Sequence, residues 1–209
     1  MKKALITIGS TREYIDPVRY ISNESSGQQG MALIKVLLKK KFHVVCLHGY
    51  LQVKPIISSQ IKYIFTPNAR SMLVEAKKNI KVDLAIFNAA VSDYKVKNYS
   101  KQKIKKESEL NIQLRKNPDI LKSICNSKQR PKTTVGFAYE TNNVLSNAKK
   151  KLKNKKCDYL ILNFPFDKNP IFNSRYNNGG ILNFDGNYIE IGKAAKTSFA
   201  NQIIRHILK

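Results

Sequence analysis

Apolar runs of strand length alternate with segments of helical period along almost the whole chain of 209 residues. The run LAIF at 84–87 is apolar at every position, which is typical of a strand covered on both faces of a sheet. Strands are expected over residues 3–8, 42–47, 61–65, 84–87, 133–138 and 157–163. Helices are expected over residues 27–41, 69–79, 118–127, 142–154 and 194–208. This alternation predicts an α/β fold with a Rossmann-like, doubly wound, mostly parallel sheet in a single domain spanning 1–209.

Irregular stretches separate these segments. Residues 9–26 form a polar, glycine-containing stretch that is expected to be a loop, and the Asn- and Pro-rich residues 164–180 are expected to be another. The lysine-rich stretch at about 95–111 has almost no apolar pattern and predicts a charged, solvated flap. Pro118 suits the first turn of a helix that Asn117 could cap. The turn sequence FDGN at 184–187 predicts a C-terminal β-hairpin between two short strands.

The chain carries a formal net charge of +24, from 38 Lys and Arg against 14 Asp and Glu. Such an excess suggests nucleic acid as a partner. However, the basic residues are scattered without an aromatic-interleaved stripe, and Lys, Asn and Ile are enriched together, which favours a compositional bias of the genome. Nucleic acid is therefore not the expected partner, although a functional polyanion-binding surface stays open as the less favoured alternative.

The three cysteines, Cys46, Cys125 and Cys157, are widely spaced and odd in number, so they predict neither a disulfide framework nor a zinc site. They favour a reducing compartment, and a cytoplasmic location is expected. The basic and then apolar N-terminus is too short for a signal-peptide core of roughly 7–15 residues. No apolar run approaches the roughly 20 residues of a membrane helix, so no association with a membrane is expected.

Small, aromatic and cationic residues follow the expected strands, at the edge where doubly wound sheets bind their ligands. GSTRE at 9–13 and ESSGQQG at 24–30 would bring backbone N–H groups and a helix N-terminus to this edge. NAAVSDY at 88–94 leaves room for a flat base or sugar beside a carboxylate, and KIKK at 103–106 lies on the expected flap. KNPD at 116–119 begins another helix, and GFAYETN at 136–142 offers Phe137 for stacking. Together these residues describe a site for a nucleotide and an acid.

One further pattern resembles short-chain dehydrogenases. NAA at 88–90 followed by a Tyr-x-x-x-Lys element at 99–103 mimics their catalytic elements. The tyrosine, however, comes too soon after Ala90 and within the charged stretch, and a Gly-rich fingerprint is absent from the first turn. Hydride transfer is therefore not the expected reaction.

Taken together, these stretches resemble the phosphopantothenoylcysteine synthetase (phosphopantothenate–cysteine ligase) family. The matching pieces are ITIGSTREYIDPVRYISNESSGQQG at 6–30, NAAVSDYKV at 88–96, KIKK at 103–106, RKNPDIL at 115–121, VGFAYETNN at 135–143 and Asn163. Their order and spacing hold over nearly the whole chain, and the block DPVRYISN followed by SSG is highly particular.

The resemblance implies a ligase that joins 4′-phosphopantothenate to cysteine and gives phosphopantothenoylcysteine in coenzyme A biosynthesis. The bacterial type uses CTP through an acyl-cytidylate intermediate and releases pyrophosphate, whereas the eukaryotic type generally uses ATP. The family further implies Mg²⁺ with the nucleotide and a homodimer. In bacteria the ligase is often fused to a flavin-dependent decarboxylase; here a stand-alone ligase without flavin is expected, with a separate phosphopantothenoylcysteine decarboxylase possible.

The resemblance also implies roles for single residues. Asn23 would contact the acyl intermediate and help the second step, and Lys103 on the flap would neutralise the triphosphate. The residues implied for the nucleotide are Phe87, Asn88, Ala89, Asp93, Lys103, Asp119, Ile120, Leu121, Lys122, Phe137, Lys151 and Lys155. Those implied for the phosphopantothenate side are Arg19, Asn23, Ser25, Ser26, Gly27 and Ala90. No residue is implied as a ligand of a protein-built metal site.

The chain departs from the family pattern at GST (9–11), Asn88, Ser92 and Tyr139, and each of these changes adds bulk or polarity near the expected base pocket. The nucleotide preference is therefore less firmly implied than the ligase activity. The alternative from another class is a Rossmann-like module that binds polyanions or nucleic acid without turnover, whose affinity would fall steeply with salt. A third possibility keeps the fold and has lost turnover.

Overall fold

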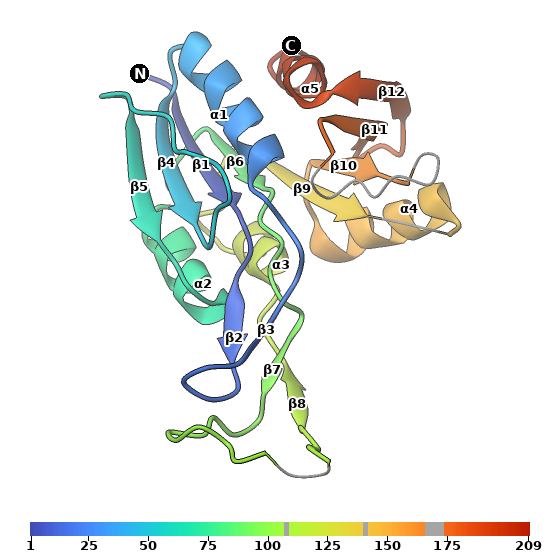
Figure 1. Ribbon diagram of the computed structural model, residues 1–209. Helices are drawn as coiled ribbons and strands as arrows, with labels where there is room; N and C mark the ends of the chain where they lie inside the picture. The colour runs from blue at the N-terminus through green and yellow to red at the C-terminus, as the bar shows by residue number, and fades with distance from the viewer. Residues whose placement is uncertain (107–108, 140–141, 166–173) are drawn as a thin grey trace.

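The computed structural model describes residues 1–106, 109–139, 142–165 and 174–209. Its main sheet has eight strands: β1 (Lys3–Ile8), β4 (His43–His48), β5 (Ile61–Phe65), β6 (Leu84–Phe87), β9 (Thr133–Tyr139), β10 (Tyr159–Asn163), β11 (Tyr176–Asn183) and β12 (Tyr188–Ala195). Their order is β12-β11-β10-β9-β6-β1-β4-β5. The six strands from β10 to β5 are parallel, and β11 and β12 continue the sheet as an antiparallel hairpin. The predicted doubly wound sheet with a C-terminal hairpin is confirmed (Figure 1).

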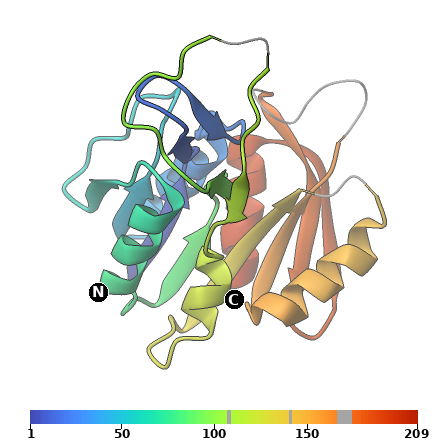
Figure 2. The same ribbon diagram turned by 90° about the horizontal axis from the view of Figure 1, so that it is seen from below.

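Helices cover both faces of this sheet (Figures 1 and 2). One face packs against α1 (Gln28–Lys39) and α5 (Lys196–Ile207), and the other against α2 (Ala69–Lys78), α3 (Ile120–Cys125) and α4 (Val144–Lys155). Because successive side chains of a strand point to opposite faces and both faces are covered, the interior strands need mostly apolar residues at successive positions. All four residues of β6 are buried for this reason.

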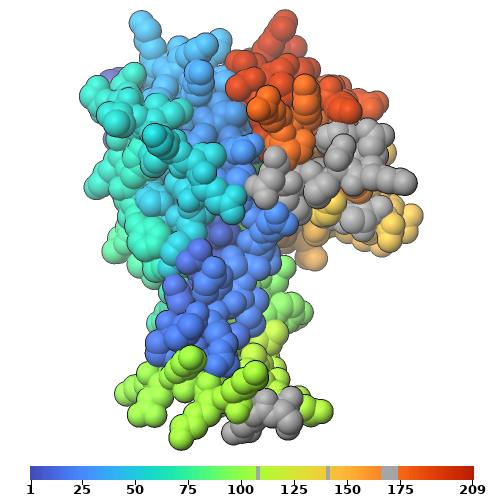
Figure 3. Space-filling view, in the orientation of Figure 1, coloured from blue at the N-terminus to red at the C-terminus, as the bar shows by residue number. Residues whose placement is uncertain are grey.

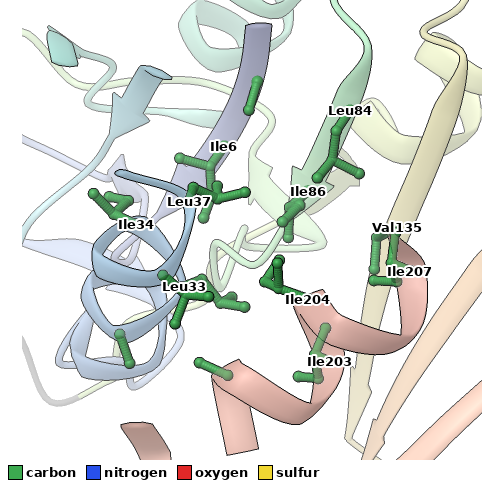
Figure 4. Packing of buried hydrophobic residues seen from close by; sticks show 14 of the residues in the cluster. Ile6, Leu33, Ile34, Leu37, Leu84, Ile86, Val135, Ile203, Ile204 and Ile207 are labelled. Atoms are coloured by element: carbon green, nitrogen blue, oxygen red, sulfur yellow. The ribbon is translucent and has the colours of Figure 1, made fainter. Parts of the chain in front are cut away.

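The core between α1, α5 and the sheet is built from branched aliphatic side chains (Figure 4). Leu33 and Leu37 of α1 and Ile204 of α5 are fully buried, and they pack over Ile86 and Ile6 of the strands. This packing fixes the N-terminus of α1 over the carboxyl edge of β1, where the ligand site was expected.

Two small antiparallel sheets project from the main sheet (Figures 1 and 3). One is the hairpin of β2 (Arg12–Tyr14) and β3 (Tyr20–Ser22); the other is the ribbon of β7 (Tyr94–Val96) and β8 (Leu114–Lys116). The prediction of a loop over 9–26 is therefore wrong in part, because strand pairing and a guanidinium held between two rings order this segment. The Arg12 guanidinium carbon lies 4.2 Å from the ring centre of Tyr20 and 3.7 Å from that of Tyr50. The expected flap is the far end of the β7–β8 ribbon, and its residues 107–108 lie outside the described residues.

Several predicted boundaries shift. The third helix begins at Ile120 and is capped by Asp119, whose carboxylate accepts from the Lys122 N–H at 2.9 Å; Asn117 is not the cap. Asn117 instead donates its amide to the Ser92 carbonyl at 2.9 Å. The expected loop over 164–180 ends at Tyr176, where β11 starts, and residues 166–173 of it lie outside the described residues. Both strands of the C-terminal hairpin are eight residues long rather than short.

The three cysteines are buried free thiols. Burial raises the pKa of Cys46 and of Cys157 to about 12, which leaves these sulfurs as unreactive core atoms. Within the described ranges, no helix is both long and apolar enough to pass through a bilayer.

Candidate active site

A cavity of about 760 Å³ opens at the carboxyl edge of the sheet, between the start of α1 and the start of α3. It brings together most of the residues that the sequence indicated. The indicated residues that line it are Asn23, Ser25, Ser26, Gly27, Phe87, Asn88, Ala89, Ala90, Asp93, Asp119, Ile120, Leu121, Phe137, Lys151 and Lys155. Arg19, Lys103 and Lys122 do not line it.

The segment before α1 forms one wall of the cavity. Gly27 takes the N-cap position with φ of 81°, a left-handed conformation that suits glycine, and a Cβ atom there would lie 2.6 Å from Leu51 Cδ2. Gln28 and Gln29, at the start of α1, line the cavity, so an anion bound there would lie at the positive end of this helix. Asn23 donates one amide N–H to the Val91 carbonyl at 3.0 Å. Since an amide nitrogen carries two N–H groups, the second can be offered to a ligand.

The segment from 88 to 93 forms the floor and is held by the chain around β1. Asn88 N–H donates to the Thr7 carbonyl at 3.1 Å, and Ala90 N–H donates to the Gly9 carbonyl at 2.8 Å. Ser92, one of the departures from the family pattern, is buried and donates its hydroxyl to the Tyr94 carbonyl at 2.7 Å. The added hydroxyl is thus satisfied within the protein, while the Asp93 carboxylate stays exposed beside the cavity.

The opposite wall, from α3 and α4, is cationic. Lys155 Nζ lies 3.3 Å from Asp119 Oδ2, and Lys151 lies one turn earlier on α4. The Lys122 side chain is exposed, and its N–H is used by the Asp119 cap. Phe137 of β9 is half-buried and packs on the α1 and α5 side of the sheet. The cavity therefore combines an aromatic ring, which suits a base, with two ammonium groups and a helix N-terminus, which suit phosphates.

Sequence reasoning missed part of the cavity wall. Gln29, Asn177 and Lys196 line the cavity, and only Gln29 belonged to a stretch that attracted attention. Asn177 lay in an expected loop, and Lys196 lay among many surface lysines. Asn163, which the family resemblance matches without implying a role, also lines the cavity.

Arg19 and the flap meet away from the cavity. The Arg19 side chain donates to the Ile104 carbonyl at 2.6 Å, and the Ile104 N–H donates to the buried Asp16 carboxylate at 3.1 Å. Asp16 also accepts from the N–H groups of Val18 and Arg19, each at 2.8 Å. The loop between β2 and β3 thus holds the flap at the residue that follows Lys103.

Burial by itself raises the pKa of Asp16, but the three backbone N–H groups and the Arg19 guanidinium outweigh it and hold that pKa below its ordinary value. Because the folded pKa is lowered, the contact is fully present above the unfolded value of about 3.9 and is lost as pH falls through the folded pKa. We expect the Ile104 amide resonance in NMR spectra to titrate with a midpoint below about 3.9. Asp16→Asn should abolish this transition. A midpoint above the ordinary value would contradict the assignment.

The sequence and the fold of the chain are similar to those of known proteins. A family model described as the DNA/pantothenate metabolism flavoprotein C-terminal domain matches residues 1–209. The chain belongs to this family. The resemblance found in the sequence is confirmed at this level.

Among relatives of this pantothenate-metabolism family, the coenzyme A biosynthesis bifunctional protein CoaBC of Haemophilus influenzae is 41% identical over 160 residues, which are 76% of this chain and 40% of that protein. The chain spans about half the length, or less, of the curated CoaBC relatives it matches. A crystal structure of the C-terminal domain of CoaBC is 31% identical with a TM-score of 0.82, covering 99% of this chain and 93% of that one. A mutant of Cab2 in complex with phosphopantothenate-cysteine has the same fold, with 18% identity, a TM-score of 0.76 and coverage of 99% and 85%.

Proposed function

We propose that this protein joins 4′-phosphopantothenate to cysteine with CTP. The observation that carries the proposal is that the start of α1, the 88–93 segment and the cationic wall of α4 all line one cavity. The named activity of the CoaBC relatives, coenzyme A biosynthesis, and the phosphopantothenate-cysteine bound by Cab2 support this choice of substrates.

The reaction takes two steps. The carboxylate of phosphopantothenate attacks the α-phosphorus of CTP, a P–O bond forms, and pyrophosphate leaves. The amine of cysteine then attacks the acyl carbon, an amide bond forms, CMP leaves and the amine loses a proton. The first step brings two anions together, so cations must offset their repulsion. Lys151 and Lys155 would do this at the phosphates, with Lys103 on the flap, while Phe137 would pack on the base.

Mg²⁺ would enter with the nucleotide. In the described part of the chain, no group of three His, Cys, Asp or Glu side chains could hold a metal by itself. Mg²⁺ is commonly held by substrate phosphates with one or two carboxylates. The exposed Asp93 carboxylate beside the cavity fits that arrangement, and the ion would neutralise charge on the triphosphate.

We also propose a cytoplasmic homodimer that joins through the projecting arms. The β2–β3 hairpin and the ribbon with its flap expose large apolar side chains: Tyr14, Val18, Tyr20, Tyr94, Tyr99, Leu110, Ile112 and Leu114. A second copy of the chain would cover this concentrated apolar surface. Sedimentation at micromolar concentration should give the mass of a dimer, and a monomer would overturn the proposal.

The experiment that tests the reaction is pyrophosphate release with Mg²⁺ and phosphopantothenate, measured with CTP and ATP, with and without cysteine. We expect release that cysteine stimulates and that CTP supports better than ATP. A preference for ATP would keep the ligase and implicate Asn88 or Tyr139 in the nucleotide choice. No release with either nucleotide would contradict the proposed function.

A further inference from the structure

Two buried amides in the cavity wall lack part of their hydrogen bonding. Gln29 of α1 is 8% exposed and Asn177 of β11 is 1% exposed, and the Asn177 amide nitrogen donates to Gln29 Oε1 at 2.7 Å. Gln29 Nε2 and Asn177 Oδ1 have no hydrogen-bond partner among the described residues. A half-turn of both side-chain amides would exchange the nitrogen and oxygen atoms of each, and one N–H donor and one oxygen acceptor would still be unpaired. Since buried polar groups are normally paired, a ligand that supplies an acceptor and a donor is indicated here.

An ammonium group and another amide lie at the same edge of the sheet. Asn177 pairs across the strands with Ala194, two residues before Lys196, and the Lys196 N–H donates to the Arg175 carbonyl at 3.1 Å. Lys196 lines the cavity, its ammonium donates to the Ser174 carbonyl at 2.5 Å, and partial burial lowers its pKa. Asn163 pairs with Gly179 on β11, and its Oδ1 atom is buried and has no partner in the described ranges.

These groups lie on the face of the sheet opposite to Lys151 and Lys155. Ile161 of β10 and Ile181 of β11 belong to the core under α1 and α5, so Asn163 and Asn177, an even number of residues away, face the same side. Leu152 of α4 belongs to the core on the other face. The cavity thus has one cationic end for the triphosphate and a second end on the side of α1, α5 and Phe137. Among the described residues, this second end holds the Lys196 ammonium, the unpaired Gln29 N–H and the unpaired oxygens of Asn177 and Asn163.

We propose that this second end binds the cysteine substrate by its α-amino-acid group, an inference that rests on the proposed function. The Lys196 ammonium and the Gln29 amide N–H donate hydrogen bonds to the carboxylate of cysteine. The oxygens of Asn177 and Asn163 accept from the amine, which orients the nucleophile of the second step. The nucleotide base is neutral and offers no anion to Lys196. A phosphate dianion would be repelled by the two amide oxygens. The zwitterionic amino-acid group of cysteine therefore fits this end better than a base or a phosphate does.

Cysteamine is cysteine without its carboxylate, so a comparison of the two amines measures the contact of the carboxylate with Lys196 and Gln29. Wild-type protein should use cysteine over cysteamine by about 100-fold or more in kcat/KM. Lys196→Met should reduce that ratio by about tenfold or more, because the contact to the carboxylate is gone. Lys196→Arg, which keeps the charge, should retain most of the preference. Lys153→Met, at an exposed position of α4 outside the cavity, is the control and should leave the ratio unchanged.

An unchanged ratio in Lys196→Met, or a rise in KM for phosphopantothenate alone, would overturn the inference. A folding defect lowers kcat/KM for cysteine and for cysteamine alike and leaves their ratio unchanged. A changed ratio therefore reports the loss of a contact to the carboxylate and not a loss of folded protein. If wild-type protein makes no product with CTP or ATP, the proposed function fails, and calorimetric titration with cysteine and cysteamine tests the subsite by itself. Cysteine binding that Lys196→Met weakens by about tenfold or more would support it, and equal or undetectable binding of the two amines would overturn it.

Discussion

Asn23→Ala is expected to let the acyl-nucleotide accumulate in the presence of cysteine and to slow the second step by about 100-fold or more. The Val91 carbonyl accepts one N–H of the Asn23 amide at 3.0 Å, which leaves the second N–H for a ligand. In the proposed reaction that N–H stabilises negative charge on the acyl oxygen as cysteine attacks. Alanine removes the donor while the segment from Ser25 to Gly27 keeps its place. Rapid quenching followed by chromatography of the acyl-nucleotide measures the effect.

Asn154→Ala serves as the control, because Asn154 is an exposed asparagine on α4 outside the cavity. The Asn23–Val91 hydrogen bond contributes only about 0.5–1.5 kcal/mol, so the variant should remain folded at the assay temperature. Normal product yield without any detectable intermediate would remove Asn23 from the second step.

The sheet could be predicted from the sequence because its signal is local. LAIF at 84–87 is the strand β6 at the predicted residues, because an interior strand needs apolar side chains on both faces. IKYIF at 61–65 is the edge strand β5, also at the predicted residues. The start of β11 could not be predicted, because YNNGG has low strand propensity. Pairing with β12 from Tyr176 and with β10 from Gly179 imposes the strand there. Gly179 is required because a Cβ atom would lie 1.8 Å from the Leu162 carbonyl oxygen.

The cavity residues likewise fall into those that could be predicted from the sequence and those that could not. Residues near the carboxyl end of a strand or just before a helix, such as Phe137, Asn88 and Ser26, could be placed at one edge of the sheet from topology alone. The Gln29–Asn177 pair could not be predicted, because its members are 148 positions apart and meet only when α1 and the antiparallel hairpin are in place.

The cap of α3 could be narrowed to two residues from the sequence but not decided. Asn117 and Asp119 are both good caps, and the tertiary hydrogen bond from Asn117 to Ser92 decides between them.

Lys103→Ala is expected to slow nucleotide-dependent activation by about 100-fold, seen as a slower burst of pyrophosphate before cysteine is added. Lys103 does not line the cavity, so its proposed role requires the flap to move toward the bound nucleotide. The hydrogen bonds of Asp16 and Arg19 to Ile104 hold the flap beside this residue and would guide that movement. The second step, started by adding isolated acyl-nucleotide and cysteine, should be slowed far less.

Lys101→Ala is the matched control, since Lys101 is another exposed lysine of the flap and its removal lowers the net charge equally. A general effect of surface charge would slow both variants alike and would disappear at high salt, because exposed charges are screened beyond roughly 10 Å at 0.1 M ionic strength. A specific contact with the triphosphate makes the loss larger in Lys103→Ala at every salt concentration. Equal rates of activation in wild type and Lys103→Ala would leave Lys151 and Lys155 as the cations that carry the first step.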